Sequence, residues 1–290
     1  MGKELVYSTT TRCLGETRNI KNFQRGLRVI ETSKFQNANF YFSEIFGSRK
    51  TCFLDKDDYR QTFQKIIKGC DLVFNTSHAP IHFPFFFQDY NISKKKSVYE
   101  KRILRSIELS GMLHAKWIVI HVGTALDSTG RYDLKESVHK NICYLKEFVS
   151  CAMQNHIGIA IENGTNMEEE VTPSVDELIE ITDYYNHVYQ TEILGICFDF
   201  GHANVGNLDI YREIQKIGKR LKVTHLHDNF GSDTHNFPYD GTVDWENAAK
   251  ALKDIDYDGD LTLEVTYKDN PFTEDTLNET YALLDKISHL

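Results

Sequence analysis

The sequence has few prolines, no low-complexity segment and no long apolar run. Only five of its 290 residues are proline and 41% are hydrophobic, which is typical of a folded globular chain. A membrane-spanning helix needs roughly 18 consecutive apolar residues, and the sequence contains no such run. The start, MGKELVYSTTTRC, has no apolar core of signal-peptide length. We therefore expect a cytoplasmic protein without a membrane segment.

Paired cysteines and an excess of positive charge are also missing. The six cysteines, at positions 13, 52, 70, 143, 151 and 197, contain no CxxC pair, which disfavours zinc ribbons and disulfide frameworks and favours reduced thiols. Lysine and arginine number 33 against 42 for aspartate and glutamate, a formal net charge of -9. Because the average field repels polyanions, nucleic acid is a disfavoured partner.

Short apolar runs alternate with longer amphipathic segments along the whole chain. This alternation is typical of βα units around a parallel sheet. The apolar runs predict strands over residues 5–10, 27–33, 71–78, 117–123, 157–164, 194–202, 223–229 and 261–267. Apolar residues at three- and four-residue spacing predict helices over 99–113, 133–154, 174–186, 209–221, 244–255 and 273–290.

This order of elements predicts an α/β fold, a single (β/α)8 TIM barrel over residues 1–290. A chain of this length commonly forms one such domain. A doubly wound open sheet is the alternative architecture. It is disfavoured because no glycine-rich dinucleotide-binding motif follows the first predicted strand.

Metal-capable side chains stand toward the carboxyl ends of the predicted strands. They are Glu31, His78, His121, Glu162, Asp199 with His202, His225 with His227, and Glu264. A closed barrel brings the carboxyl ends of all its strands to one mouth, where barrel enzymes place their chemistry. We therefore predict a divalent metal site at this mouth.

The predicted core of the metal site is a set of three carboxylates and one imidazole: Glu162, Asp199, His225 and Glu264. These ligands suit Zn²⁺, Mn²⁺, Co²⁺ or Mg²⁺ better than ions that prefer thiolates. Strand alternation places His225 and His227 on one face, while Leu226 faces the helical layer. A charged group inside a barrel also needs a partner, because an unpaired buried carboxylate is very costly.

Each of these residues also has an ordinary explanation. A histidine at a strand end, such as His78 or His121, is commonly a hydrogen-bonded core or surface residue. Glu162 or Glu264 could be half of a buried ion pair, and Asp199 could cap the helix after its strand. Their joint occurrence at five or more strand ends favours one shared site, because each ordinary explanation needs a separate cause.

Six motifs in a fixed order carry a resemblance to a known superfamily. They are SHAP (77–80), VIHVG (119–123), IAIENG (159–164), CFDFGHAN (197–204), HLHDNFGSDTH (225–235) and LTLEV (261–265). Together they resemble the xylose isomerase-like TIM barrels, which include sugar isomerases and epimerases and the endonuclease IV class of abasic-site nucleases (AP endonuclease family 2). The resemblance covers essentially the whole chain.

The sugar-enzyme members imply one metal ion and two proton-transferring glutamates. Their pattern assigns the metal to Glu162, Asp199, His225 and Glu264, and catalysis to Glu162 and Glu264, which exchange protons across the substrate. His202 resembles the residue that hydrogen-bonds a substrate oxygen, and His78 and His121 are further candidates for substrate binding. One departure stands out, because the arginine that epimerases carry six positions after the metal histidine is Gly231 here.

The endonuclease branch implies three zinc ions instead of one. Its pattern places His78, His121 and Glu162 on the first, Glu162, Asp199, His225 and Glu264 on the second, and His202, Asp233 and His235 on the third. All nine residue types are present in this chain. The Tyr-Leu pair with which the nucleases open DNA is replaced by Ile81 and His82, and the phosphate-binding excess of positive charge is absent.

Three hypotheses follow. The first is a metal-dependent isomerase or epimerase acting on a small keto-sugar or polyol, with proton transfer through an enediolate. The alternative is an endonuclease IV-like zinc phosphodiesterase acting on abasic DNA, and the third is a non-catalytic sugar-binding barrel. We expect one divalent ion, and up to three if the additional ligands are used; a homo-oligomer stays open.

Overall fold

Eight parallel strands pair in sequence order and close into a barrel in the computed structural model of the chain. The structure describes residues 5–14, 19–42, 52–81, 87, 96–165, 173–267 and 272–290. The strands are β1 (Val6–Thr10), β2 (Asn37–Tyr41), β3 (Val73–His78), β4 (Trp117–Ile120), β5 (Gly158–Glu162), β6 (Leu194–Asp199), β7 (Leu221–Leu226) and β8 (Asp260–Leu263). The predicted TIM barrel is therefore confirmed.

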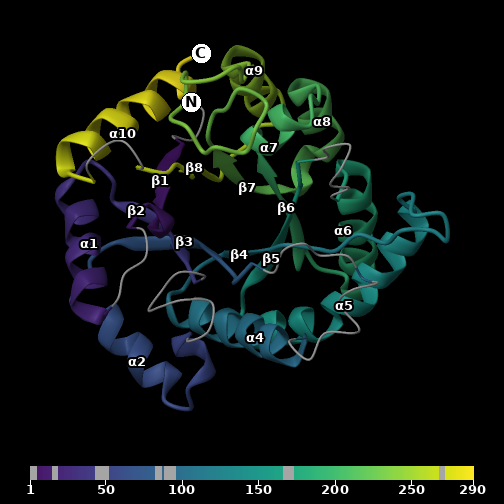
Figure 1. The fold of residues 1–290 in the computed structure, drawn as a ribbon, viewed down its shortest axis with the longest axis horizontal. Coiled ribbons are helices and arrows are strands. Elements are labelled where there is room, and N and C mark those ends of the chain that lie inside the picture. Colours follow the sequence, from purple (N-terminus) through teal and green to yellow (C-terminus); the bar gives the residue numbers. More distant parts are fainter. Residues whose placement is uncertain are drawn as a thin grey trace.

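Helices form a ring outside the strands (Figure 1). They are α1 (Ile20–Thr32), α2 (Tyr59–Ile66), α4 (Lys96–Met112), α5 (Leu134–Gln154), α6 (Val175–Tyr189), α7 (Phe200–Val205), α8 (Ile210–Ile217), α9 (Trp245–Asp254) and α10 (Glu274–Ser288). Short 3₁₀ turns η1 (Thr11–Leu14), η2 (Phe53–Asp55) and η3 (Gly218–Arg220) join them. Within the described residues, no helix has both the length and the apolar character needed to cross a membrane.

Strand alternation divides the core into two parts. Leu226 and Leu263 point outward and join the large cluster between strands and helices, as predicted for Leu226. A smaller apolar layer fills the barrel interior and consists of Val119, Ala160, Cys197 and Val223. This layer forms a floor beneath the carboxyl ends of its strands, so the polar residues two positions further along each strand face the mouth.

The strand predicted over residues 27–33 is wrong, because this segment belongs to helix α1. Phe23, Leu27 and Ile30 are buried at four- and three-residue spacing, which is a helical period that the short apolar run concealed. The second strand is Asn37–Tyr41 instead. Glu31 therefore lies on helix α1 and not at the mouth. Its carboxylate accepts a hydrogen bond from the backbone N–H of Asp71 at 2.7 Å.

Several predicted strands also end earlier than expected. β6 ends at Asp199, and the side chain of Asp199 accepts a hydrogen bond from the backbone N–H of His202 at 2.7 Å, so it caps α7. The helix-capping explanation for Asp199 is thus correct, although one carboxylate oxygen is still left for another role. His121 and Glu264 each follow the last residue of their strand.

A buried polar cluster fixes the loop that follows β4. The side-chain amide of Asn141 accepts from Gly123 N (2.9 Å) and donates to Gly123 O (2.7 Å) and to the Glu177 carboxylate (2.7 Å). The Tyr132 hydroxyl donates to the other Glu177 oxygen at 2.7 Å. Helices α5 and α6 therefore hold the backbone two residues beyond His121, which sets where His121 can reach.

Glu177 makes the stability of the fold depend on pH. Its burial raises the pKa to about 7 from the ordinary 4.5, although Tyr132 and Asn141 donate hydrogen bonds that lower it. Because the folded-state pKa is raised, the contribution to stability is fully present below about pH 4.5 and is lost as the pH rises through 7. A shift of this size corresponds to about 3 kcal/mol.

We expect Glu177→Gln to remove this part of the pH dependence, because glutamine is neutral throughout the range. The free energy of unfolding, measured with urea at pH 5 and pH 8, should fall less in Glu177→Gln than in the wild type, by up to about 3 kcal/mol. Glu147→Gln, at an exposed position on the neighbouring helix α5, is the matched control and should follow the wild type. An equal fall in Glu177→Gln and wild type would contradict the assignment.

Candidate metal centre at the barrel mouth

The predicted ligands from separate strands meet at the carboxyl end of the barrel. Their relative exposures are low: His78 1%, Glu162 3%, Asp199 0%, His225 0% and Glu264 2%. His121 is half-buried, with its side chain 18% exposed. Strand order explains the convergence, because adjacent strands in the closed barrel place their last residues side by side.

Four side chains form a central group around Nδ1 of His225. From this nitrogen, Glu162 Oε1 lies at 2.6 Å, Glu264 Oε2 at 3.2 Å and Asp199 Oδ2 at 4.0 Å. One ligand atom from each of the four lies within 4.8 Å of the others. The structure thus brings together the whole core set predicted from the sequence.

Glu162 and Glu264 each turn their second oxygen away from His225. Glu162 Oε2 lies 2.7 Å from Nε2 of His121 and 3.3 Å from Nε2 of His78, which makes a second candidate ligand group. Glu264 Oε1 accepts a hydrogen bond from Nη1 of Arg12 at 3.2 Å. Each glutamate therefore contributes one oxygen to the central group and has the other oxygen held by a nitrogen partner.

Asp199 is oriented in the same way. Its Oδ1 caps α7 and lies 3.0 Å from Nε2 of His227, while its Oδ2 is buried and has no hydrogen bond within the described residues. A buried carboxylate oxygen without a donor is costly, and a cation at the centre of the group would satisfy it.

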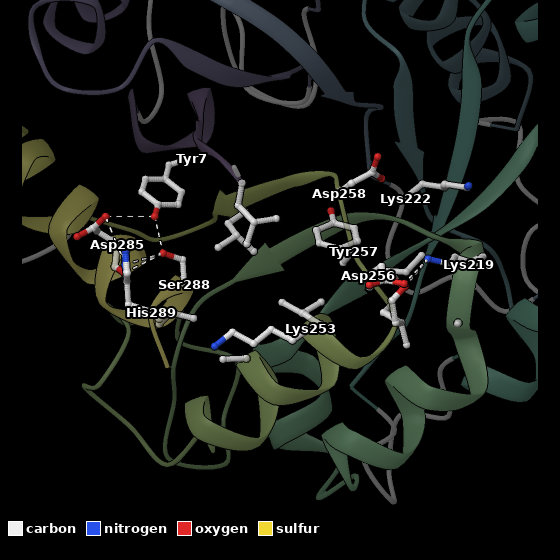
Figure 2. A pocket seen from close by; sticks show the side chains of 18 of the residues that line it. Tyr7, Lys219, Lys222, Lys253, Asp256, Tyr257, Asp258, Asp285, Ser288 and His289 are labelled. Carbon is white, nitrogen blue, oxygen red and sulfur yellow. Dashed lines mark hydrogen bonds and ion pairs between the residues drawn. The ribbon is translucent and has the colours of Figure 1, made fainter. Parts of the chain in front are cut away.

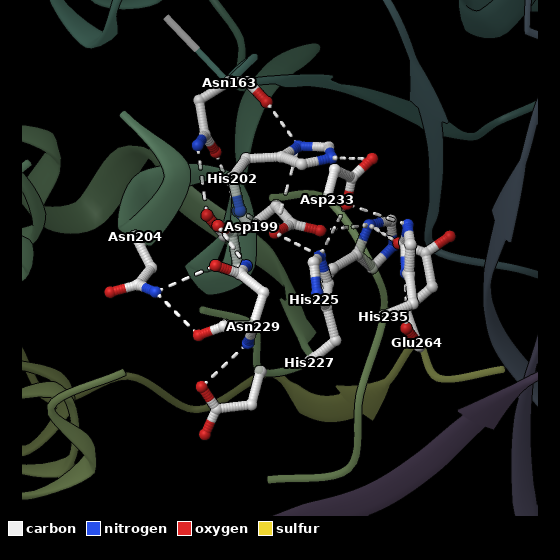
Figure 3. Close-up of polar contacts among 12 residues, drawn as sticks. Asn163, Asp199, His202, Asn204, His225, His227, Asn229, Asp233, His235 and Glu264 are labelled. Atoms are coloured by element: carbon white, nitrogen blue, oxygen red, sulfur yellow. Dashed lines mark hydrogen bonds and ion pairs between the residues drawn. The ribbon is translucent and has the colours of Figure 1, made fainter. Parts of the chain in front are cut away.

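An outer group lies beside the central one (Figure 3). It consists of His202, His227, Asp233 and His235, with one ligand atom of each within 4.8 Å of the others. Asp233 Oδ1 is 3.2 Å from Nε2 of His235 and 3.7 Å from Nε2 of His227, and Asp233 Oδ2 is 3.8 Å from Nε2 of His202. The loop after β7 therefore folds back toward α7.

Backbone carbonyls fix the tautomer of three histidines in these groups. Nδ1 of His78 donates to Ala79 O at 2.7 Å, Nδ1 of His202 to Asn163 O at 2.9 Å, and Nδ1 of His235 to Glu264 O at 2.7 Å. A carbonyl can only accept, so Nδ1 carries a proton, and Nε2 is the nitrogen that faces a carboxylate. Close approach of Nε2 and a carboxylate oxygen requires either a proton or a metal ion between the two atoms. Histidines that bind metals commonly have the other ring nitrogen bonded to a carbonyl in this way.

The spacing of the donor atoms fits a divalent ion. With metal–ligand bonds of about 2 Å, donor atoms of a tetrahedral site lie about 3.3 Å apart. The separations from His225 Nδ1 in the central group, 2.6–4.0 Å, and from the Asp233 oxygens in the outer group, 3.2–3.8 Å, bracket this value. Oxygen and imidazole donors suit Zn²⁺, Mn²⁺, Co²⁺ or Mg²⁺.

The site keeps its carboxylates ionised. Burial alone would raise the pKa of Glu162, but the charges of His225 and His121 outweigh it and hold this pKa well below its usual range. Burial is likewise outweighed at Glu264, where His225 and Arg12 lower the pKa. Burial disfavours the charged form of His225, yet the two glutamates raise its pKa to about 9. The site is therefore built to hold positive charge among ionised carboxylates.

Arg12 received no role from the sequence, and His227 was named among the metal-capable side chains at the strand ends but was assigned to no ligand group. Arg12 follows β1 in η1, and its guanidinium lies 5.7 Å from the centre of the Tyr41 ring and 3.1 Å from Nε2 of His235. The sequence placed His227 on the face of His225 but offered no reason to count it as a ligand. His82, which replaces a nuclease residue, lies outside the described residues.

A separate hollow of about 880 Å³ opens at the other end of the barrel (Figure 2). Tyr7, Lys222 and Leu261, at the beginnings of their strands, are among its lining residues, together with Lys253 and His289 from the surrounding helices. None of the predicted ligands lines it. This end of a barrel serves stability more than chemistry, so the hollow is not the candidate site.

Comparison with known proteins gives a family and a set of structural neighbours. The sequence model of a family described as xylose isomerase-like TIM barrel matches residues 34–287. An uncharacterised protein of Methanocaldococcus jannaschii, MJ1311, is 29% identical over 194 residues, which are 64% of this chain and 62% of that protein. The alignment thus covers less than two thirds of this relative.

Some of the structural neighbours are named as sugar epimerases or as epimerase-like proteins. A D-tagatose 3-epimerase-like protein superposes with a TM-score of 0.73 at 19% identity and covers 98% of this chain and 99% of its own. The D-allulose 3-epimerase of Methylomonas sp., in complex with D-allulose, gives 0.70 at 14% identity over 99% and 94%. At these identities the likeness establishes the fold.

We expect Glu162→Gln to weaken metal binding at two groups at once, because its two oxygens serve the central group and the His78–His121 group. Removing a charged ligand oxygen should lower affinity by at least about tenfold. Elemental analysis and competition with a chelator would measure it, with Glu147→Gln, exposed on α5, as the control. Unchanged metal content in Glu162→Gln would exclude Glu162 as a ligand.

Proposed function

The chain belongs to the xylose isomerase-like TIM barrel family, and we propose that it is a metal-dependent sugar isomerase or epimerase. Its substrate would be a small keto-sugar or polyol. The observation that carries the proposal is the pair Glu162 and Glu264, which approach His225 Nδ1 from β5 and from the end of β8 at 2.6 and 3.2 Å. The names of the structural neighbours, which include an allulose epimerase with its sugar bound, support the same chemistry.

The central group would hold the catalytic ion through Glu162, Asp199, His225 and Glu264. When bound, a divalent ion would supply Lewis-acid polarisation of a carbonyl and an adjacent hydroxyl, which acidifies the proton on the hydroxyl-bearing carbon next to the carbonyl. The burial of this group excludes bulk water, so charge interactions in it are strong.

Proton transfer would fall to the two glutamates. Both are ionised near neutrality because their pKa values are lowered, so either can accept a proton from a substrate carbon. For epimerisation, one glutamate would accept the proton from the substrate carbon on one face, which leaves an enediolate. The other glutamate, after taking up a proton from solvent, would donate it to the opposite face, and the first would release its proton to solvent. Since each glutamate has one oxygen anchored by Arg12 or by His121 and His78, its position is fixed before substrate arrives.

The flanking histidines would serve substrate or further ions. His202 lies at the rim of the central group, with Nδ1 held by Asn163 O, and is proposed to hydrogen-bond a substrate oxygen through Nε2. His78 and His121 are proposed to bind substrate or, with Glu162, an additional ion. Alternatively, His202, Asp233 and His235 are proposed to hold an outer ion, in which case Nε2 of His202 would bind this ion instead of substrate. The chain would then carry one to three metal ions.

A phosphodiesterase is the second candidate, because three ligand groups adjoin one another and two of them share Glu162. Clustered ions can generate hydroxide and stabilise a leaving oxygen. The test is cleavage of a duplex with one abasic site by zinc-loaded protein, and complete absence of cleavage would remove this candidate.

Glu264→Gln is expected to abolish turnover of a ketohexose while the fold remains. Loss of one proton-transfer group should lower the rate by roughly 10²–10⁴-fold. The measurement is epimerisation across a ketohexose panel in D₂O, read as product formation and as deuterium incorporation at the epimerised carbon.

The matched control for this prediction is Glu279→Gln, at an exposed position on α10. It should retain wild-type turnover. An active Glu264→Gln variant would refute the role of Glu264, and wild-type protein that binds sugars without converting any of them would indicate a non-catalytic barrel.

A further inference from the structure

His227 is a fully buried histidine whose ring nitrogens have no hydrogen bond. Its relative exposure is 0%, and neither Nδ1 nor Nε2 has a hydrogen-bond partner among the described residues. Native proteins rarely leave buried polar atoms unsatisfied, so the ring is missing a partner. The residue belongs to the outer group with His202, Asp233 and His235.

The position of Nε2 indicates which kind of partner is missing. This nitrogen lies 3.0 Å from Asp199 Oδ1 and 3.7 Å from Asp233 Oδ1. The shorter separation is within ion-pair range, but it makes no hydrogen bond of acceptable geometry. Nε2 therefore faces a space shared with the other donors of the outer group, all within 4.8 Å of one another.

The surrounding fold makes room for the imidazole at this place. Gly201, in the first turn of α7, passes so close that a Cβ on it would lie 1.9 Å from Cε1 of His227 and 2.2 Å from Nδ1. On its other side the ring stacks on His235, with centroids 4.0 Å apart and planes 23° from parallel. The ring is thus clamped between helix and loop, and a larger residue at position 201 would have to displace it.

We infer that His227 is the fourth protein ligand of the outer cation, so that His202, His227, Asp233 and His235 together close its coordination shell. The inference rests on the outer ion of the proposed function. Three imidazoles and one carboxylate form a complete tetrahedral set for zinc. Nδ1 of His202 and Nδ1 of His235 donate to Asn163 O and Glu264 O, so Nε2 is the nitrogen that each ring would present to the ion.

A closed shell gives the outer ion a structural role. Catalytic zinc sites keep a position open for water or substrate, whereas structural sites have four protein ligands. The ion would tie the loop after β7, whose Asp233 side chain is 39% exposed, to α7 and to β7 itself. It would also leave substrate chemistry to the central group. Because the ion would occupy Nε2 of His235, Arg12, which lies 3.1 Å from this nitrogen, would hydrogen-bond only to Glu264.

The competing explanation is that a protonated His227 forms an ion pair with Asp199. The two explanations predict opposite effects for a pair of nearly isosteric substitutions. His227→Gln removes both the ligand and the charge. His227→Glu supplies a carboxylate that can bind the ion, but it would repel Asp199 and Asp233 if no ion were present.

The experiment compares metal content in the wild type, His227→Gln, His227→Glu and Asp233→Asn, each loaded with zinc and freed of excess ion. Elemental analysis gives the stoichiometry, and cobalt substitution reports the coordination number, because tetrahedral Co²⁺ absorbs more strongly than five- or six-coordinate Co²⁺. His187→Gln, exposed on α6, is the control. Asp233→Asn carries the test of the ion if a substitution at the buried position 227 prevents folding.

We expect His227→Gln and Asp233→Asn to bind the outer ion at least about tenfold more weakly, and His227→Glu to recover part of that loss. Full outer-ion binding by His227→Gln, or weaker binding by His227→Glu than by His227→Gln, would overturn the inference. Wild-type protein that holds only one ion, at the central group, would also overturn the inference about the outer ion. It would leave the epimerase proposal unaffected. Two ions and no sugar turnover would instead refute the proposed function alone.

Discussion

The site depends on the charge balance among three carboxylates buried around one imidazole. Glu162, Asp199 and Glu264 lose most of their hydration at the barrel mouth, and a buried anion is tolerated only with positive charge or donors around it. Each carboxylate therefore divides its two oxygens, one toward Nδ1 of His225 and one toward an outer nitrogen. The outer partners lie at or just after the carboxyl ends of β1, β3, β4 and β7, so charge balance draws on strands from around the whole barrel.

Much of the surrounding structure serves to keep these partners in place. Asn141 and Glu177 hold the backbone beyond His121, and Asp199 is oriented partly because it caps α7. Gly201 lacks a side chain where His227 needs the space. None of these contacts involves substrate, but each limits where a ligand of the central or outer group can lie. Rigid packing around the mouth therefore fixes the geometry of the site.

The central and outer groups are suited to different work. The central group has three carboxylates and one imidazole, and its two glutamates can also transfer protons. The outer group is rich in imidazole and includes a loop residue, Asp233, that is partly exposed. In the proposed arrangement, the central group carries out the chemistry and the outer group holds the loop after β7 in place. This division also separates a sugar enzyme from a phosphodiesterase, since the latter would need open positions on several ions.

The sequence by itself determined the barrel and the core of the site. Alternating apolar runs and amphipathic segments indicate βα units, and barrel closure forces strand-end residues such as Glu162 and His225 together whatever the loops do. The same reasoning failed at 27–33, because a short apolar run has no clear period and Leu27 and Ile30 pack as one face of a helix. Only the tertiary structure decided which oxygen meets which nitrogen, and it alone revealed Arg12 as part of the site and placed His227 in the outer group. These choices depend on side-chain torsions and on close packing between distant segments, such as Gly201 against His227, and no local pattern in the sequence encodes them.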